Sequence, residues 1–148
     1  MCDSRCAAGP PGVYAAGDIA RWHNPLFGES MRIEHWTNAS EMGTAAGRGA
    51  ALGDAAREFA SVPYAWSDQH GLRIEVAGLP RPGDDVHVIE ADPAQHRLVA
   101  VHGRAGRLAA VVGFGSRRTV LCYRRMLLTG ASMKDALTGT GPVVLTPR

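Results

Sequence analysis

The sequence predicts an α+β protein, in which an antiparallel strand meander is followed by two C-terminal helices and preceded by an incomplete strand–loop–helix piece of an α/β domain. After Pro63, apolar and polar residues alternate over short segments, which is the period of half-buried strands. Before Pro63, one short apolar run ends in Gly17-Asp18 and one long segment has helical spacing. The predicted domains are therefore residues 1–60 and 63–148.

The first predicted element is a short buried strand from Val13 to Ala16. It follows the turn signal Pro10-Pro11-Gly12 and ends at Gly17-Asp18. A small residue at the end of a strand lets a ligand approach the backbone, and a carboxylate there can accept hydrogen bonds from sugar or polyol hydroxyls. Taken alone, a Gly-Asp pair after a strand is far more often just a turn. The chain from there to about Ile33 is expected to be a loop.

A helix is predicted next, from Thr37 or Asn38, either of which is a good N-cap, to about Leu52. Glycine inside a helix costs about 1 kcal/mol relative to alanine, so several of them indicate that something packs close to the backbone. That neighbour is expected to be a helix, a sheet or a bound group. The glycines concerned are Gly43, Gly47, Gly49 and Gly53.

The second part of the chain predicts four antiparallel strands and two helices. A helix is expected from Arg117 to Leu128, with Gly130 as the residue that ends it. Ser132 and Asp135 resemble a capping box for a final short helix, and the Gly/Pro-rich tail from Thr138 is expected to be frayed. The predicted strands are Leu72–Val76, Val86–Ala91, Leu98–His102 and Leu108–Val112.

The composition excludes several classes of function. With 45% hydrophobic and 20% charged residues, the chain is typical of soluble globular proteins. A net charge of +2 without a basic run does not favour nucleic acid, and no apolar run reaches the roughly 18 residues of a membrane span. Three cysteines without a CxxC motif predict reduced thiols in a cytoplasmic protein. Neither a metal site nor a catalytic constellation of nucleophile and base is predicted.

Three segments together resemble a known family. The segments VYAAGDIARW, RIEHWTNASEMG and VPYAWSDQ occur in this order, as in the C-terminal third of the FAD-dependent ferredoxin reductases. These are NAD(P)H-using flavoproteins that supply electrons to two-iron ferredoxins in oxygenase systems. The resemblance runs from about Pro11 to the last helix. The WSDQ segment followed by the strand meander is specific to this group, whereas AAGD is shared by a wider flavoprotein superfamily.

The resemblance implies a partial FAD site. Asp18 would hydrogen-bond the ribityl chain, with Gly17 allowing close approach. Within Glu34-His35-Trp36, Trp36 would contact the flavin ring end of the site, largely through its backbone, and the start of the following helix would face the pyrimidine side of the flavin. Trp66 would lie near the flavin and near the face where the ferredoxin docks. The alternatives are core packing for both tryptophans and an ion pair between His35 and Glu34.

A basic helix offers a second candidate surface. A ferredoxin of this kind is acidic, so a basic face would steer it toward the reductase. The alternative is a solvated helix face whose arginines pair within the fold. The residues are Arg117, Arg118, Arg124 and Arg125, with Trp66 as a further docking residue.

The chain also departs from the family pattern, because it lacks the GxGxxG motifs that bind FAD and the nicotinamide dinucleotide. Gly113-Phe114-Gly115 is the nearest match, but Arg118 stands at the third glycine position. The expected function is therefore that of a fragment or split subunit of a ferredoxin reductase that is not competent alone. NAD(P)H would be used only with the missing domain, which a second polypeptide could carry. The alternative is a non-catalytic module that docks a ferredoxin or itself.

Overall fold

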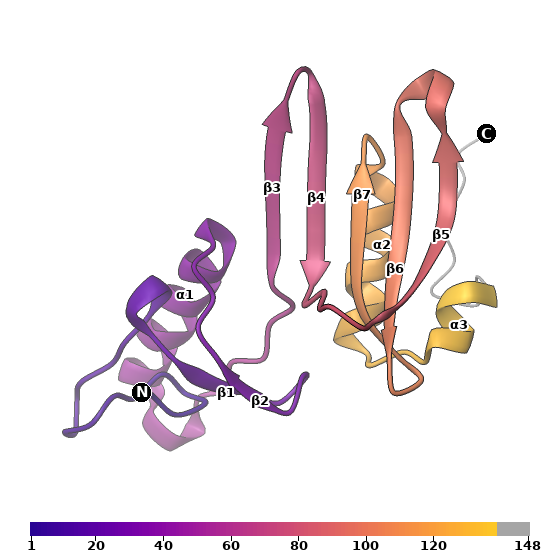
Figure 1. Ribbon diagram of the computed structural model, residues 1–148. Helices are drawn as coiled ribbons and strands as arrows, with labels where there is room; N and C mark the ends of the chain where they lie inside the picture. The colour runs from indigo at the N-terminus through magenta and orange to yellow at the C-terminus, as the bar shows by residue number, and fades with distance from the viewer. Residues whose placement is uncertain (139–148) are drawn as a thin grey trace, which may run out of the picture. The chain divides into compact units, whose positions relative to one another are not determined.

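The computed structural model describes residues 1–138, and these form two compact units. Unit 1 is Met1–Pro63, and unit 2 begins at Tyr64 (Figure 1). Together they confirm the α+β class with antiparallel strands. The tail after Thr138, which was expected to be frayed, lies outside the described residues. Within those residues, no helix is both long enough and apolar enough to cross a membrane.

Unit 1 contains a β-hairpin where the sequence predicted only a loop. Strands β1 (Trp22–Asn24) and β2 (Glu29–Met31) pair antiparallel. The turn between them is stabilised by the buried Asn24, whose side-chain oxygen accepts a hydrogen bond from the Leu26 N–H at 3.1 Å. The same side chain donates from its amide nitrogen to the Ser61 carbonyl at 2.8 Å. Asn24 thus stabilises the hairpin turn and connects it to Ser61, near the end of unit 1.

The predicted strand from Val13 to Ala16 is wrong. This segment makes only an isolated bridge, Ala7 to Tyr14, and Val13 is 46% exposed. A buried strand of an α/β sheet needs parallel neighbours for its backbone groups, and unit 1 provides none among its described strands. Tyr14 is instead held by its hydroxyl, which donates to the Gly49 carbonyl at 2.9 Å.

Helix α1 spans Trp36–Leu52 and begins slightly before the predicted N-cap residues. His35 occupies the cap position in an extended conformation, without a side-chain cap. The buried Asn38 amide donates back to the Ile33 carbonyl at 3.1 Å. Gly49 has the expected close neighbour, since a Cβ there would lie 2.6 Å from the Arg5 carbonyl oxygen. Gly43 and Gly47 have open space around the Cβ position, as does Gly53, which lies just after the helix at its C-cap.

Unit 2 is built on a five-stranded antiparallel sheet, not on a simple meander. Its order is β3-β4-β7-β6-β5, so β4 pairs with β7, and β5 lies at the far edge. Strands β4 to β7 therefore follow a Greek-key order. The strands are β3 (Tyr64–Gln69), β4 (Leu72–Gly78), β5 (Asp85–Asp92), β6 (Arg97–Arg104) and β7 (Arg107–Phe114). Only β3 was not predicted.

Two glycines allow this arrangement. Gly78 ends β4 with a φ of +86°, and a Cβ there would meet the Ala109 carbonyl oxygen of β7. Leu79 then donates its N–H to the same carbonyl at 3.0 Å, and the chain leaves for the opposite edge of the sheet. On the covered face, Gly113 of β7 leaves room for Val120.

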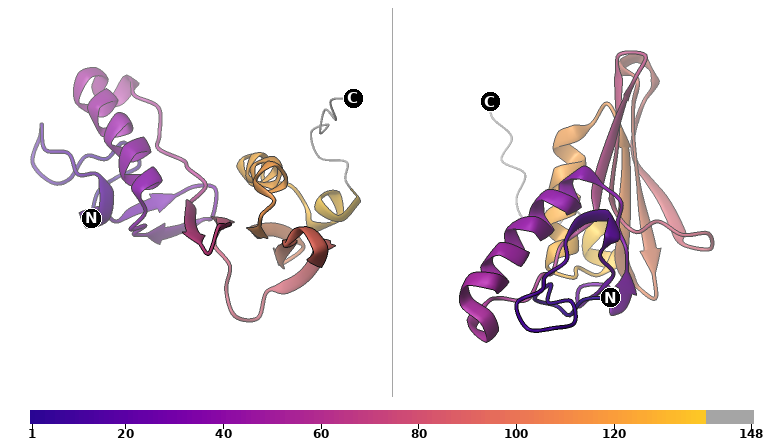
Figure 2. Two further views of the ribbon diagram at one scale, coloured as in Figure 1. Left: turned by 90° about the horizontal axis from the view of Figure 1, so that it is seen from above. Right: turned by 90° about the vertical axis from the view of Figure 1, so that its left-hand side faces the viewer.

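The helices of unit 2 follow the sequence prediction closely. Helix α2 spans Arg117–Leu128 and packs on β7 and β4, on one face of the sheet (Figure 2). Gly130 has a φ of +64° just after the helix, as expected for the residue that ends it. Helix α3 (Met133–Thr138) has the predicted capping box: the Asp135 N–H donates to the Ser132 hydroxyl at 3.1 Å, and that hydroxyl donates to the Asp135 carboxylate at 2.7 Å.

Candidate functional site

The first candidate site lies at the start of α1 in unit 1. Gly17 opens a short 3-10 helix, η1 (Gly17–Ile19), with a φ of +73°. Gly17 is buried, and a Cβ on it would lie 3.3 Å from the Cβ of Ala39 in the first turn of α1. The lack of a side chain at Gly17 thus lets η1 pack close to α1. Asp18, which follows, is exposed beside the helix start.

Arg32 contacts both Asp18 and Glu34. One guanidinium nitrogen donates to the Asp18 carbonyl at 3.5 Å, and another forms an ion pair with the Glu34 carboxylate. Glu34 thus pairs with Arg32 and not with His35. Arg32 stands in the RIEHW segment but was not among the predicted site residues. A cation two positions before an acid was the signal available for it.

His35 and Trp36 differ in their surroundings. His35 is partly buried and accepts the Ala39 N–H on its carbonyl at 2.9 Å. Its Nδ1 atom is buried and has no hydrogen-bond partner among residues 1–138. The Trp36 side chain is 76% exposed, so it is not packed into the core of unit 1, and Ile19 is 83% exposed. Exposed apolar side chains thus come from both η1 and the start of α1.

The arrangement is suited to a ligand that carries both hydroxyl groups and a flat ring. Asp18 can accept hydrogen bonds, and the start of α1 is the positive end of the helix dipole, which favours electron-rich groups. These features fit one wall of a flavin site. A resident metal has no comparable support, since residues 1–138 contain no cluster of three potential metal ligands.

The second candidate region is in unit 2 around Trp66. Trp66 lies on the edge strand β3 and is 41% exposed. Its ring centroid is 5.6 Å from that of Tyr64, and the Arg73 guanidinium carbon lies 5.6 Å from the Trp66 ring. Arg73 also forms two hydrogen bonds of 2.8 Å with Asp68. These neighbours hold one part of the Trp66 ring and leave the rest accessible.

A buried polar cluster lies next to Trp66, whose neighbours include Glu75 on β4 and the ring of Tyr64. Glu75 is fully buried and accepts a hydrogen bond from the Tyr64 hydroxyl. Arg117 of α2 lies 3.9 Å from the Glu75 carboxylate, and the Arg124 guanidinium lies 5.1 Å from the centroid of the Tyr64 ring. Burial, followed by the hydrogen bond to Glu75, raises the pKa of Tyr64 to about 12. Tyr64 therefore stays protonated and remains a hydrogen-bond donor at neutral pH.

The four arginines proposed from the sequence do not form one uniform surface. Arg117 and Arg124 contact Glu75 and Tyr64, so both take part in tertiary packing within unit 2. Arg118 and Arg125 are exposed on α2. Arg117 is also largely exposed, with 63% of its side chain accessible. The accessible part of the predicted docking set is therefore Trp66, Arg117, Arg118 and Arg125.

Comparisons with known proteins agree on one family. Residues 64–141 match the protein family described as "Reductase C-terminal". The chain is 30% identical over 143 residues to the anthranilate 1,2-dioxygenase system ferredoxin–NAD(+) reductase component of Burkholderia cepacia. It is 38% identical over 133 residues to the 3-phenylpropionate/cinnamic acid dioxygenase ferredoxin–NAD(+) reductase component of Photorhabdus laumondii. These alignments cover 96% and 90% of the chain but only 34% and 33% of the relatives.

Solved structures show the same relation. The crystal structure of Fdr9 superposes with a TM-score of 0.76 at 31% identity, over 90% of this chain and 35% of that one. A covalent putidaredoxin reductase–putidaredoxin complex superposes with a TM-score of 0.76 over 87% of this chain and 30% of its own. At 23% identity, this second likeness shows the fold alone. The chain thus spans about a third of the length of the relatives that it matches.

Proposed function

The chain belongs to the reductase C-terminal family, and from this premise we propose that it is the C-terminal part of an FAD-dependent ferredoxin reductase. In this proposal, residues 1–60 are the last portion of an FAD-binding domain, and residues 63–148 are the domain that faces the ferredoxin. Electrons pass from NAD(P)H through FAD to a two-iron ferredoxin. The dinucleotide-binding motifs are absent from the 148 residues, so the phosphate-binding parts come from outside them.

The observation that supports this proposal best is the close approach of the Gly17 backbone to Ala39. It places Asp18 beside the start of α1, where a ribityl hydroxyl and the flavin ring would lie close together. Asp18 would accept the hydroxyl hydrogen bond, and Trp36 and His35 would line the ring end, while Arg32 and Glu34 hold the segment in place.

The chemistry supplied by bound FAD is the acceptance of a hydride and the release of single electrons. The residues of this chain would bind and orient the flavin, while most of the FAD affinity would come from contacts to the pyrophosphate and the adenosine. We therefore propose that the chain alone is not a competent reductase. None of Cys2, Cys6 and Cys122 forms a disulfide within residues 1–138, which supports a reducing, cytoplasmic location.

The test is an FAD titration of the 148-residue chain, alone and mixed with the N-terminal two thirds of a related reductase. Alone, the chain should not retain FAD through gel filtration. In the mixture, FAD retention and NADH-dependent electron transfer to a ferredoxin should appear. Asp18→Ala should then lower FAD affinity about 10- to 100-fold, because a hydrogen bond to a charged group is worth about 1.5–3 kcal/mol.

Asp54→Ala is the matched control, because Asp54 is also exposed and lies in the first turn of a 3-10 helix, η2 (Gly53–Ala55), in unit 1. It should leave FAD affinity unchanged. Equal losses in both variants would contradict the role of Asp18. Stoichiometric FAD bound to the chain alone would contradict the proposal that the chain needs the missing parts.

For the ferredoxin, we propose that the docking surface includes Trp66, Arg118 and Arg125. Its support is the partial exposure of Trp66 and the accessible arginines of α2. The reassembled reductase should show an increased KM for ferredoxin with Arg118→Glu or Arg125→Glu, and this increase should diminish at high salt. A KM that is independent of these charges would contradict the surface.

A second candidate function is self-association through unit 2. Side chains of Val86, Val88 and Leu98 lie on the sheet face opposite α2 and are 52%, 60% and 37% exposed. An exposed apolar face of this kind favours contact between molecules. Sedimentation should then show concentration-dependent dimers that Val88→Lys removes, while Leu128→Lys on α2 leaves them. A strict monomer at high concentration would contradict this function.

A further inference from the structure

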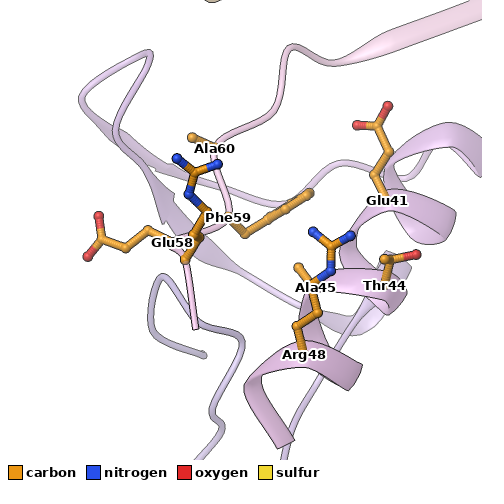
Figure 3. Close-up of a pocket in the computed structure, with 8 residues that line it drawn as sticks. Glu41, Thr44, Ala45, Arg48, Glu58, Phe59 and Ala60 are labelled. Atoms are coloured by element: carbon orange, nitrogen blue, oxygen red, sulfur yellow. The ribbon is translucent and has the colours of Figure 1, made fainter. Parts of the chain in front are cut away.

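A pocket of about 350 Å³ lies in unit 1 between α1 and the segment that follows it. Its helix side is lined by Glu41, Thr44, Ala45 and Arg48, and its other side by residues 57–60 (Figure 3). None of the lining residues belongs to the proposed flavin wall of Gly17, Asp18 and Trp36. The pocket is therefore a separate feature of the unit, and its interpretation does not depend on the proposed function.

The charged residues that line this pocket differ in whether they have partners within the fold. Arg48 and Arg57 both line it, both are exposed, and neither has a hydrogen-bond or ion-pair partner within residues 1–138. Glu58 is engaged elsewhere, since its carboxylate accepts the Ser4 hydroxyl at 2.9 Å and lies 4.0 Å from Arg5.

Figure 3 shows the directions of these side chains. The side chain of Arg48 reaches from α1 toward Phe59, whereas the carboxylate of Glu58 points away from the pocket. The carboxylate of Glu41, on the other rim, also points away from the guanidinium of Arg48. Arg48 and Arg57, from different segments, thus line one concavity, and within residues 1–138 neither forms an ion pair with the two glutamates that also line it.

The floor of the pocket is apolar and well anchored. Phe59 is only 8% exposed, and its ring packs against Trp22 with a centroid distance of 5.3 Å. Its N–H donates to the Ser4 carbonyl, which fixes the backbone of the segment. Ala45 and Ala60 add small apolar surfaces on the two sides. An anchored aromatic ring beside cations is a suitable place for a flat apolar group.

We propose that this pocket binds a small organic oxyanion, with a phosphate or carboxylate group held by Arg48 and Arg57 and a flat apolar body lying against Phe59. Guanidinium groups form charge-assisted, often bidentate hydrogen bonds with such oxyanions. A pocket of about 350 Å³ lies at the lower end of the range of small-molecule sites, so the ligand is about the size of a single ring with its acidic group.

The test uses phenyl phosphate as the probe and the amide NMR spectrum of the full chain as the readout. Saturable shifts should appear at residues 44–48 and 57–60, with a dissociation constant of about 1 mM or tighter. Benzyl alcohol, which has the ring without the charge, and inorganic phosphate, which has the charge without the ring, should each bind at least about tenfold more weakly. Benzoate should bind like phenyl phosphate, because the shared chemistry is the oxyanion.

Arg48→Gln and Arg57→Gln should each weaken phenyl phosphate binding about tenfold or more, since each removes one charge-assisted contact. Arg21→Gln is the matched control, because Arg21 is an exposed arginine of the same unit outside the pocket, and it should have no effect. The proposal is overturned if phenyl phosphate gives no saturable shift. It is equally overturned if inorganic phosphate or benzyl alcohol binds as tightly, or if Arg21→Gln weakens binding as much as the pocket variants.

Discussion

Replacing Gly113 with alanine tests how α2 is seated on the sheet. Gly113 lies in β7 between Glu75 of β4 and Val99 of β6, on the face that α2 covers. A Cβ added there would come closer to a methyl of Val120 than 3.0 Å, a separation that real Cβ atoms essentially never show. Val120 is fully buried, and a valine in a helix has one strongly preferred χ1, so its methyl cannot rotate away.

The expected magnitude follows from two opposing effects. Forcing an extra methyl into a packed core costs about 1–3 kcal/mol. Replacing glycine in a strand interior with alanine recovers about 0.5–1 kcal/mol of backbone entropy. Gly113→Ala should therefore lower the free energy of unfolding of unit 2 by about 1–2 kcal/mol. In a Val120→Ala background, which by itself costs about 2 kcal/mol, the same change should become stabilising by about 0.5–1 kcal/mol.

The assay is a double-mutant cycle measured by urea unfolding. The amide signals of β6 and β7 serve as the readout, so that only unit 2 is followed. An interaction energy of about 1.5–3 kcal/mol between positions 113 and 120 is expected. If Gly113→Ala lowers the free energy of unfolding equally with and without the Val120 methyls, a clash with Val120 is not the cause of the destabilisation, and the reasoning is refuted.

Three further predictions concern single residues. Gly47→Ala should raise the free energy of unfolding of unit 1 by about 0.5–1 kcal/mol in urea unfolding, because this helix glycine is exposed with open space at its Cβ position, and a loss of stability would reveal a close neighbour. Burial of Asp84 acts to raise its pKa, but hydrogen bonds from the Arg81 N–H and the Arg104 guanidinium lower that pKa below 3.8 overall. The ionised carboxylate therefore stabilises the fold above about pH 4, and this stabilisation is lost as the pH falls further. Asp84→Asn should remove much of this acid dependence in pH-dependent urea unfolding and lower stability at pH 7 by about 1–3 kcal/mol, whereas an unchanged acid dependence would contradict it. Tyr64 has a pKa of about 12, so the protonated hydroxyl stabilises the fold fully below the ordinary pKa of 10.0, and this stabilisation is lost as the pH rises through about 12. Tyr64→Phe should remove the last step of an ultraviolet phenolate titration. It should also lower the free energy of unfolding by about 1–3 kcal/mol, because Glu75 loses the hydroxyl that donates to it.

Elements with strong local signals were predicted well. Helix α2 has the predicted bounds, because its apolar stripe and the glycine after it are both visible in the sequence. The capping box of α3 also forms as expected from Ser132 and Asp135. Strand β3 was missed because Tyr64–Gln69 is an edge strand with mostly exposed residues, so it lacks the alternating pattern of a half-buried strand.

The candidate site was predicted only in part. The family motifs singled out Gly17, Asp18 and Trp36, and the fold brings these residues to one end of α1. They could not show that Arg32 links Asp18 to Glu34, because that link depends on how the chain returns from the β1–β2 hairpin. The roles of Arg117 and Arg124 likewise emerged only from their contacts with Glu75 and Tyr64.

Local patterns were enough for the α+β class, the helices of unit 2 and the membership of the chain in a reductase family, because periodicity, caps and short motifs act over a few neighbouring residues. Contacts between segments far apart in the sequence determined three features that the local patterns did not predict. These are the pairing of β4 with β7, the absence of the expected strand at Val13 and the pocket beside Phe59. Strand order and pockets depend on which distant surfaces bury each other, and no local pattern carries that information.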